Sequence, residues 1–345
     1  MSSSRTCFVV LLGCAAVIAG CGQGPSSERP DGSAVSSVDV PSGTIVFRRY
    51  LDAQQSQAAL FTMTSEGKDE TRTTHPPDYA IDGLPDWSPD GKQIAFHREY
   101  PDKPNEIFVV SADGTDERQV DPGCPDGIPD DQICEELEPA WSPNGKTLAF
   151  AWPFGGLRQV RGEEIIDVMG VGLMGPDGSD PELITQTRRP TRAEDSNPIW
   201  SPDGRQIAFV RFNVTAEPHD ASAVFVANAD GSGEKRITPW NLNAEDPSWS
   251  PDGALISFRS ETGEGDFIGH LHTIRPDGSE VTRLTKGDGK QVFGSSFSPD
   301  SQWIVFAMTG VDGLPDLFVT RQDGTDLTPL TRTPAWESAP DWSPR

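Results

Sequence analysis

The chain has 345 residues, of which 53 are acidic and 28 are basic, so its formal net charge at pH 7 is −25. A surface with this charge repels phosphate backbones, which argues against nucleic-acid binding. It suits cations and basic partners, and it equally suits a well-solvated exported protein.

Residues 1–20 have the pattern of an export signal. Arg5 precedes an apolar run, residues 7–18, that is too short to span a bilayer. The segment ends in Ala19-Gly20-Cys21, which resembles a bacterial lipobox and predicts that Cys21 becomes lipidated. An ordinary cleavable signal with an incidental cysteine is the alternative.

Residues 21–40 lack apolar periodicity and are rich in Gly, Ser and Pro, which is typical of a flexible tether. No later stretch is apolar enough to cross a membrane. We therefore expect the lipid at Cys21 to be the only membrane anchor, on the extracytoplasmic side of a bacterial membrane.

Residues 41–345 contain a repeated phrase, Trp-Ser-Pro-Asp-Gly. Copies or remnants of it begin, between 45 and 59 positions apart, at Trp87, Trp141, Trp200, Trp249, Phe297 and Trp342. Repeats of this length with several short strands predict a radial or linear array of sheets.

Each repeat divides into four short strands. Around Trp87, the first strand ends at the Trp-Ser pair, Pro-Asp-Gly forms a tight turn, and a second strand ends at Phe96. A third strand over 107–110 leads into Asp113-Gly114, and a fourth strand forms the outer edge. Short strands joined by Gly-rich turns are what a propeller blade requires. The repeated tryptophans are interpreted as packing between blades, and the aspartates that follow them as turn formers.

The two ends of the repeat region each carry part of a blade. Residues 43–47 have the pattern of a second strand without a first, and residues 341–344 that of a first strand without a second. Pairing them predicts an all-β, six-bladed propeller, closed by its N- and C-terminal strands and without an open sheet edge.

The combined pattern Trp-Ser-Pro-Asp-Gly-x-x-Ile-Ala-Phe and Phe-Val-x-x-x-Asp-Gly resembles the repeat of TolB-type propellers over residues 42–345. It is less similar to WD repeats, whose Gly-His and Trp-Asp pairs are missing. The resemblance implies a six-bladed extracytoplasmic ring that binds protein, peptide or saccharide. TolB itself has an α/β domain before its propeller where this chain has the tether, so its role is not carried over.

Two cysteines, Cys124 and Cys134, remain once the signal and Cys21 are set aside. An even pair in an oxidising compartment, bracketing an acidic loop, predicts a disulfide. Zinc is not expected, because no histidine or further cysteine is near. This loop and an insertion that includes residues 152–164 both fall around the third blade, where binding loops are expected.

Carboxylates that differ between repeats precede the first strands, and we expect them at one mouth of the central channel. With one amide they are Asp82, Glu136, Glu138, Asp195, Asn197, Glu245, Asp246 and Glu337. Converging carboxylates could hold Ca²⁺ or receive a basic peptide. The alternative is that they are splayed into solvent. No other cofactor is expected.

Trp152, Trp240 and Trp336 fall outside the packing register and lie in predicted loops. Exposed aromatics beside carboxylates suit a saccharide or a peptide, and local loop packing is the alternative. His270 and His272 share one face of a third strand, where a packed histidine is favoured over a metal ligand. No catalytic motif is present, which favours a non-enzymatic role without settling it.

These patterns favour a monomeric, lipid-anchored envelope protein that binds a protein or peptide partner at its acidic mouth. One alternative is a saccharide-binding or saccharide-active propeller, which would use Trp240 and Trp336. The other is a calcium-stabilised structural module.

Overall fold

The computed structural model describes residues 40–124, 136–153, 158–160, 163–165, 169–185, 193–213, 221–262, 268–286, 289–310 and 313–344. The chain divides into two compact units, Met1–Ser36 and Ser37–Arg345. The predicted signal, Cys21 and most of the tether lie outside the described residues. The account below concerns the second unit.

The fold is all-β and propeller-like, and four of its sheets have four strands each. In pairing order, the first of these sheets contains β8 (Leu137–Trp141), β9 (Leu148–Pro153), β12 (Met169–Met174) and β13 (Glu182–Leu183), and the second contains β14 (Ala193–Trp200), β15 (Gln206–Asn213), β16 (Ala221–Asn228) and β17 (Lys235–Arg236). The third sheet contains β18 (Ala244–Trp249), β19 (Ile256–Thr262), β20 (Ile268–Ile274) and β21 (Thr282–Arg283). The fourth sheet contains β22 (Val292–Phe297), β23 (Trp303–Thr309), β24 (Pro315–Arg321) and β25 (Thr328–Pro329).

An eight-stranded sheet contains two further sets of four strands. One is β26 (Glu337–Trp342), β1 (Thr44–Tyr50), β2 (Ala58–Thr64) and β3 (Thr71–Arg72), and the other is β4 (Ile81–Trp87), β5 (Gln93–Glu99), β6 (Glu106–Ser111) and β7 (Arg118–Val120). The two sets meet at a single parallel pair, Ala58 with Ile81. A hairpin, β10 (Arg158–Val160) with β11 (Glu163–Ile165), and a 3₁₀ turn, η1 (Trp240–Leu242), complete the described elements.

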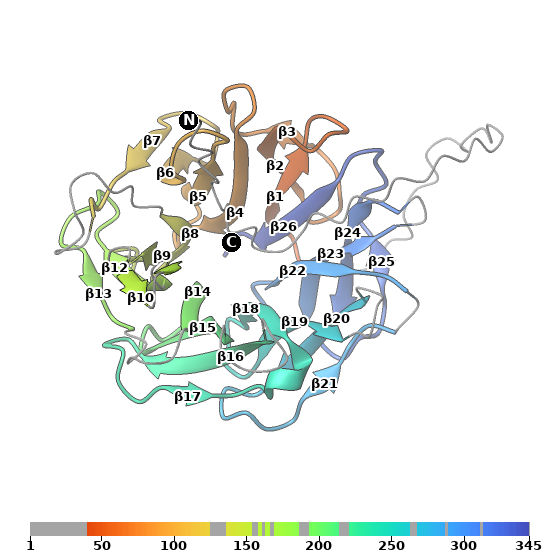
Figure 1. The fold of residues 1–345 in the computed structure, drawn as a ribbon. Coiled ribbons are helices and arrows are strands. Elements are labelled where there is room, and N and C mark those ends of the chain that lie inside the picture. The colour runs from red at the N-terminus through yellow and green to blue at the C-terminus, as the bar shows by residue number, and fades with distance from the viewer. Residues whose placement is uncertain are drawn as a thin grey trace. The chain divides into compact units, whose positions relative to one another are not determined.

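The first strand of each set, namely β4, β8, β14, β18, β22 or β26, lies nearest the centre of the unit (Figure 1). Each set then runs outward through antiparallel neighbours. The sheets therefore stand around a common centre, and the first strands line it.

The repeated turn is closed by its own side chains. In the first copy, Ser88 donates its hydroxyl to Asp90 at 2.8 Å, and the Lys92 amide donates to the same carboxylate oxygen at 3.1 Å. Gly91 has a φ of 68°, which glycine adopts without strain. The fifth copy places Ser301 there with a φ of 61°, and its hydroxyl accepts a bond from the Asp252 amide of the neighbouring turn.

The core consists of the residues that the repeat pattern marks as apolar. The six phenylalanines of the second strands, Phe47, Phe96, Phe150, Phe209, Phe258 and Phe306, are fully buried. Of the repeat tryptophans, Trp87, Trp141, Trp249 and Trp342 are buried, as inter-blade packing predicts, and Trp200 is partly buried.

Strands from the two ends of the repeat region pair with each other. In β1 and β26, Ile45 lies opposite Trp342 and Arg49 opposite Glu337. The Thr44 amide donates to the hydroxyl of Ser343 at 3.0 Å. The sequence-predicted pairing of the two partial repeats is therefore present.

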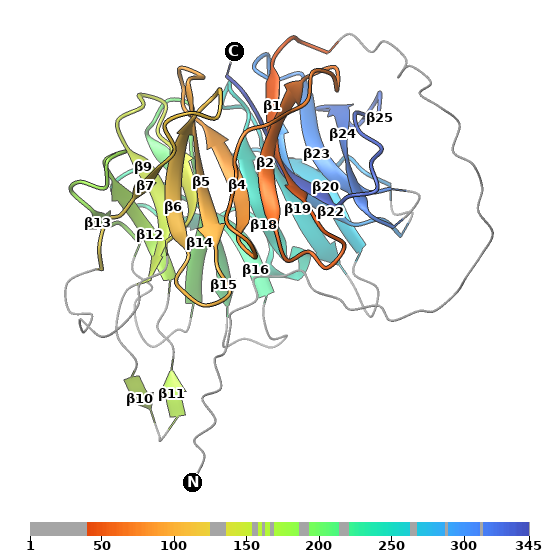
Figure 2. The ribbon, with the colours of Figure 1, turned by 90° about the horizontal axis from the view of Figure 1, so that it is seen from above.

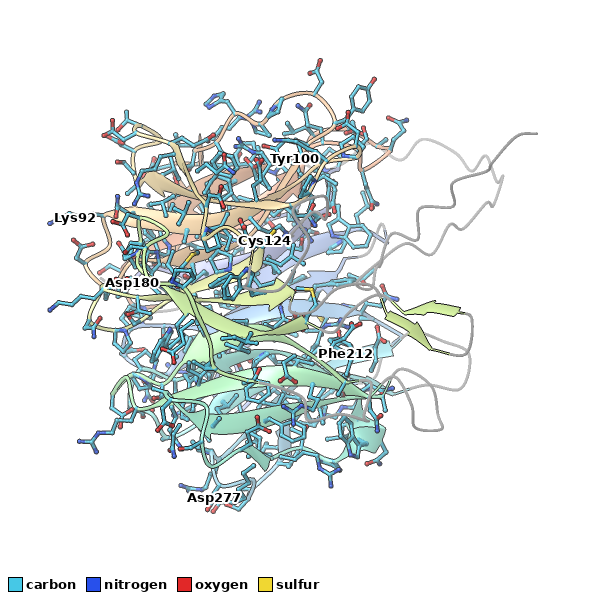
Figure 3. The ribbon with its side chains drawn as sticks, turned by 60° about the vertical axis from the view of Figure 1, so that its left-hand side comes forward. Lys92, Tyr100, Cys124, Asp180, Phe212 and Asp277 are labelled. Carbon is cyan, nitrogen blue, oxygen red and sulfur yellow. The ribbon has the colours of Figure 1, made fainter. Side chains whose placement is uncertain are left out.

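Two faces of the unit follow from the strand directions. The turn face carries the Pro-Asp-Gly turns, and the loop face carries the starts of the first strands. Figure 3 shows Lys92 and Asp180 on the turn face and Phe212 nearer the loop face. The β10–β11 hairpin extends from the loop face (Figure 2).

Candidate functional site

The six first strands share a backbone bulge near the centre. The residue three positions before the repeat tryptophan, or before Phe297, has a φ between 44° and 59° in every repeat. These residues are Leu84, Glu138, Asn197, Asp246, Gly294 and Ala339. The register of the adjoining strand pair shifts at the same point in each case. Such bulges re-aim side chains, here beside the common centre.

All six bulge residues line one central cavity of about 110 Å³. Among the bulge residues, Glu138, Asn197 and Asp246 come from consecutive repeats and form a polar sector, whereas Leu84, Gly294 and Ala339 are apolar. Asp86 and Asp341 also line the cavity. Because the first strands run from the loop face to the turn face, this cavity, the loop-face cavity, belongs to the half of the centre nearer the loop face.

Three of the predicted mouth carboxylates are instead buried ion pairs. Asp82, Asp195 and Glu337 have no exposed surface. Their partners are Arg98, Arg211 and Arg49 on the second strands, for example with 2.6 Å between Arg211 Nε and Asp195 Oδ1.

The cause is the antiparallel register, which places each arginine directly opposite its carboxylate. Burial raises the pKa of Asp82 and Asp195, and the guanidinium groups oppose that rise. The expectation that these three side chains line an open mouth is therefore corrected: they hold first strands to second strands.

Arg259 binds two further predicted carboxylates. Its Nε lies 2.8 Å from Asp246 Oδ2, and its Nη2 contacts Glu245. Burial raises the pKa of Glu245 to about 7 although Arg259 opposes the rise. Asp246 also accepts a bond from the Gly294 amide at 3.3 Å and lines the loop-face cavity, whereas Glu245 does not.

Glu138 is the predicted carboxylate whose placement agrees best with a channel site. It lines the loop-face cavity and accepts a hydrogen bond from the Asn197 amide. Within the described residues it has no ion-pair partner. Burial raises its pKa to about 7.

Glu136 occupies the position at which three other repeats carry the ion-paired carboxylate, but β9 places Trp152 where those repeats have arginine. Glu136 is only 5% exposed. Its burial, together with the nearby charges of Asp121 and Glu106, raises its pKa to about 8.

Trp152 is 4% exposed, which corrects the expectation of a loop aromatic open to ligands. Its indole donates to the Gly123 carbonyl at 3.2 Å and packs against Phe150, with 5.4 Å between ring centroids. Gly172 makes room for this pair of rings, because a Cβ at that position would lie 2.9 Å from the Phe150 ring.

The other two predicted binding aromatics also pack against their own chain. Trp240, in η1, lies 5.8 Å from Phe225 between ring centroids. Trp336 lies 5.2 Å from Phe293 and 6.3 Å from Tyr50. Both are partly buried, and neither lines a central cavity. The alternative of local packing describes them better than ligand contact.

Two channel carboxylates were missed by the sequence reasoning. Asp86 and Asp341 directly precede repeat tryptophans, where the other repeats have Ala, Ile or Ser, and that difference was the available signal. Asp86 accepts a bond from the Trp141 amide at 2.5 Å, and Asp341 accepts one from the Trp87 amide at 2.9 Å.

Asp341 therefore joins β26 to β4, and Asp86 joins β4 to β8. Burial and the charge of Asp341 raise the pKa of Asp86 well above its usual range. Burial raises the pKa of Asp341 to about 6.

The remaining predicted sites are placed only in part. His272 stacks on Phe258 at 5.1 Å between ring centroids, as a packed histidine should. Among the described residues no cluster of three or more His, Cys, Asp or Glu side chains is arranged to hold a metal ion. Cys124 is not a free thiol, but Cys134 lies outside the described residues, so the disulfide between them stays a prediction.

The sheets and their common centre define a β-propeller-like protein, and comparison with known proteins gives the family. Residues 166–345 match the model of the TolB beta propeller domain. The match spans more than half of the chain, which therefore belongs to this family. No curated protein matches the chain.

Solved structures agree on the fold. TolB from Acinetobacter baumannii superposes with a TM-score of 0.65 at 18% identity, over 88% of this chain and 67% of that one. The putative TolB from Agrobacterium tumefaciens superposes with a TM-score of 0.53 at 19% identity, over 85% of this chain and 90% of that one. The hydrazine synthase of Kuenenia stuttgartiensis superposes with a TM-score of 0.67 at 13% identity, over 89% of this chain and 48% of that one. Because the same fold occurs in an enzyme, function must be argued from the site.

Within the described residues, no helix has both the length and the apolar character needed to traverse a bilayer.

Proposed function

We propose that the chain is an exported, lipid-anchored envelope protein whose propeller binds a protein or peptide partner at the loop-face end of its central channel. The observation that carries the proposal is the loop-face cavity, which is lined by equivalent bulge residues of all six repeats, polar in three consecutive repeats and apolar in the other three. A site that combines carboxylates with apolar side chains suits a basic side chain flanked by apolar contacts.

The polar sector consists of Glu138, Asn197 and Asp246. Of the two carboxylates, Asp246 is shared with Arg259, whereas Glu138 is bonded only to a backbone amide among its described partners. A cation from a partner would therefore be received mainly by Glu138. The β10–β11 hairpin extends from the same face and adds surface in the same third repeat (Figure 2).

The partner site is tested by adding a positive charge to the cavity. Asn197→Lys places an ammonium group in the polar sector, and we expect recovery of partners from envelope extracts by pull-down to fall at least tenfold. Gln302→Lys is the matched control, because it adds the same charge on the exposed turn face, where Lys92 and Lys146 occupy the equivalent position. Equal recovery with both variants would refute the site.

We also propose that the six sets of strands form a closed ring, with β1 and β26 in the same blade. Arg48 and Ser338 are opposite one another, and Arg48 Nε donates to Ser338 Oγ at 3.0 Å. In the Arg48→Cys, Ser338→Cys variant we expect oxidation to form an internal disulfide and to raise the melting temperature. Failure of the two cysteines to react would count against closure.

A further inference from the structure

A second cavity, of about 170 Å³, lies at the turn-face half of the channel and has no role in the proposed partner site. Six aromatic side chains line it: Trp87, Trp141, Trp200, Trp249, Phe297 and Trp342. Prolines of the same turns and several serines also line it. We call this space the aromatic chamber.

The indoles present ring carbon to this chamber. The Nε1 atoms of its five tryptophans are buried, and none has a hydrogen-bond partner within the described residues. Because the nitrogen is inaccessible, whatever each indole exposes to the chamber is hydrocarbon and π surface. A ligand that relied on hydrogen bonds from the indoles is therefore disfavoured.

Two carboxylates stand at the inner end of the chamber. Asp86 and Asp341 line both cavities, so they mark the passage from one to the other. Their described partners are backbone amides and the Ser296 hydroxyl, and no described residue forms an ion pair with either. The raised pKa values of both groups fit carboxylates that are buried without a cation.

We propose that the aromatic chamber binds a small organic ammonium cation, with its charge held by Asp86 and Asp341 and its alkyl groups against the ring of aromatic side chains. Aromatic faces attract cations through their quadrupole, and they do so most strongly in a desolvated site. An anion is disfavoured by the two carboxylates and by the net charge of −25. A bare metal ion is disfavoured because no metal-binding cluster occurs among the described residues.

The inference is independent of the partner proposed at the loop face, because each cavity has lining side chains that the other lacks, although Asp86 and Asp341 line both. Glu138 and Asp246 line only the loop-face cavity, whereas the aromatic side chains line only the chamber. Variants of Glu138 or Asp246 therefore serve as controls for the chamber, and variants of the aromatic side chains serve as controls for the loop-face cavity.

The first test is titration of the full chain with choline chloride. Binding is measured by tryptophan fluorescence and by calorimetry, and titration with sodium chloride at equal ionic strength gives the reference. The control ligand is 3,3-dimethyl-1-butanol, a neutral carbon isostere of choline. We expect saturable choline binding, at least tenfold tighter than binding of the isostere, which corresponds to about 1.4 kcal/mol. Absence of choline binding, or equal binding of the isostere, would overturn the proposal.

The second test removes the charges. In the Asp86→Asn, Asp341→Asn variant we expect choline affinity to fall at least tenfold, and in Glu138→Gln we expect it to be unchanged. Unchanged affinity in the double variant would overturn the inference. If the double variant fails to fold, saturation-transfer NMR on the native chain decides: irradiation of aromatic protons must reach the choline methyl groups, and no transfer would refute the chamber as the site.

Discussion

Glu136 is a buried carboxyl whose replacement should stabilise the protein at neutral and alkaline pH. The Glu136→Gln variant keeps the shape of the side chain and removes its charge. Its carbonyl oxygen can still accept the bond that the Ile107 amide gives to the carboxylate. The variant thus measures the free energy that it costs to bury the Glu136 carboxylate in a repeat without the arginine that pairs with the equivalent carboxylate in three other repeats.

The magnitude follows from the pKa of Glu136, which rises from 4.5 to about 8 on folding. Below pH 4.5 both the folded and the unfolded chain carry the proton. As the pH rises toward 8 the unfolded chain ionises first, so the free energy of unfolding falls by about 1.4 kcal/mol per pH unit. The loss reaches about 3 kcal/mol at pH 7 and about 4 kcal/mol at pH 8, and it levels off at about 5 kcal/mol at higher pH.

Urea denaturation followed by tryptophan fluorescence measures this effect at pH 4.5, 7 and 8.5. The difference in stability between Glu136→Gln and the native chain should be near zero in acid and should grow with pH in favour of the variant. The comparison isolates this group from other carboxyls whose pKa is raised, including Glu138 and Glu245. Glu182→Gln, an exposed position in the same sheet, is the matched control.

A stability difference that is constant from pH 4.5 to 8.5 would refute the argument. So would a variant that is less stable than the native chain at pH 8.5. Either result would mean that Glu136 is compensated in the folded state by a cation.

Three further predictions concern the ion pairs, the disulfide and the anchor. Arg211→Met leaves the Asp195 carboxylate buried and unpaired, and should lower the free energy of unfolding by about 3–5 kcal/mol; adding Asp195→Asn should restore most of it in the same urea assay. Replacing Cys124 and Cys134 by Ala should cost on the order of 2–3 kcal/mol, and dithiothreitol should destabilise the native chain but not the variant. Cys21→Ser should move the protein from the membrane to the soluble fraction of fractionated cells; retention in the membrane would contradict the lipid anchor.

The scaffold was predictable because its signals are local. A Trp-Ser-Pro-Asp-Gly phrase specifies a strand end and a turn within five residues, and the turn is closed by side chains of that phrase, such as Ser88 and Asp90. The pairing of β1 with β26 also followed, because each end of the repeat region lacks the strand that the other supplies.

The site was less predictable because it depends on which residues face each other across strands. Asp82 and Asp195 were expected at an open mouth, but the arginines opposite them follow 16 positions later in both cases. That constant spacing, and the recurrence of arginine two residues after the buried phenylalanine, was the signal that the sequence offered. At Trp152 the same slot holds an aromatic residue, so its burial could have been inferred from register.

The partnership of β1 with β26 has a consequence for how the protein is made. Thr44 and Ser343 are 299 positions apart, so β1 is synthesised long before β26, the strand that covers its inner edge. Contacts of such separation are formed late and slow folding, and an uncovered strand edge invites association with other chains. A polypeptide that lacked β26 would therefore expose the edge of β1 to association with other chains.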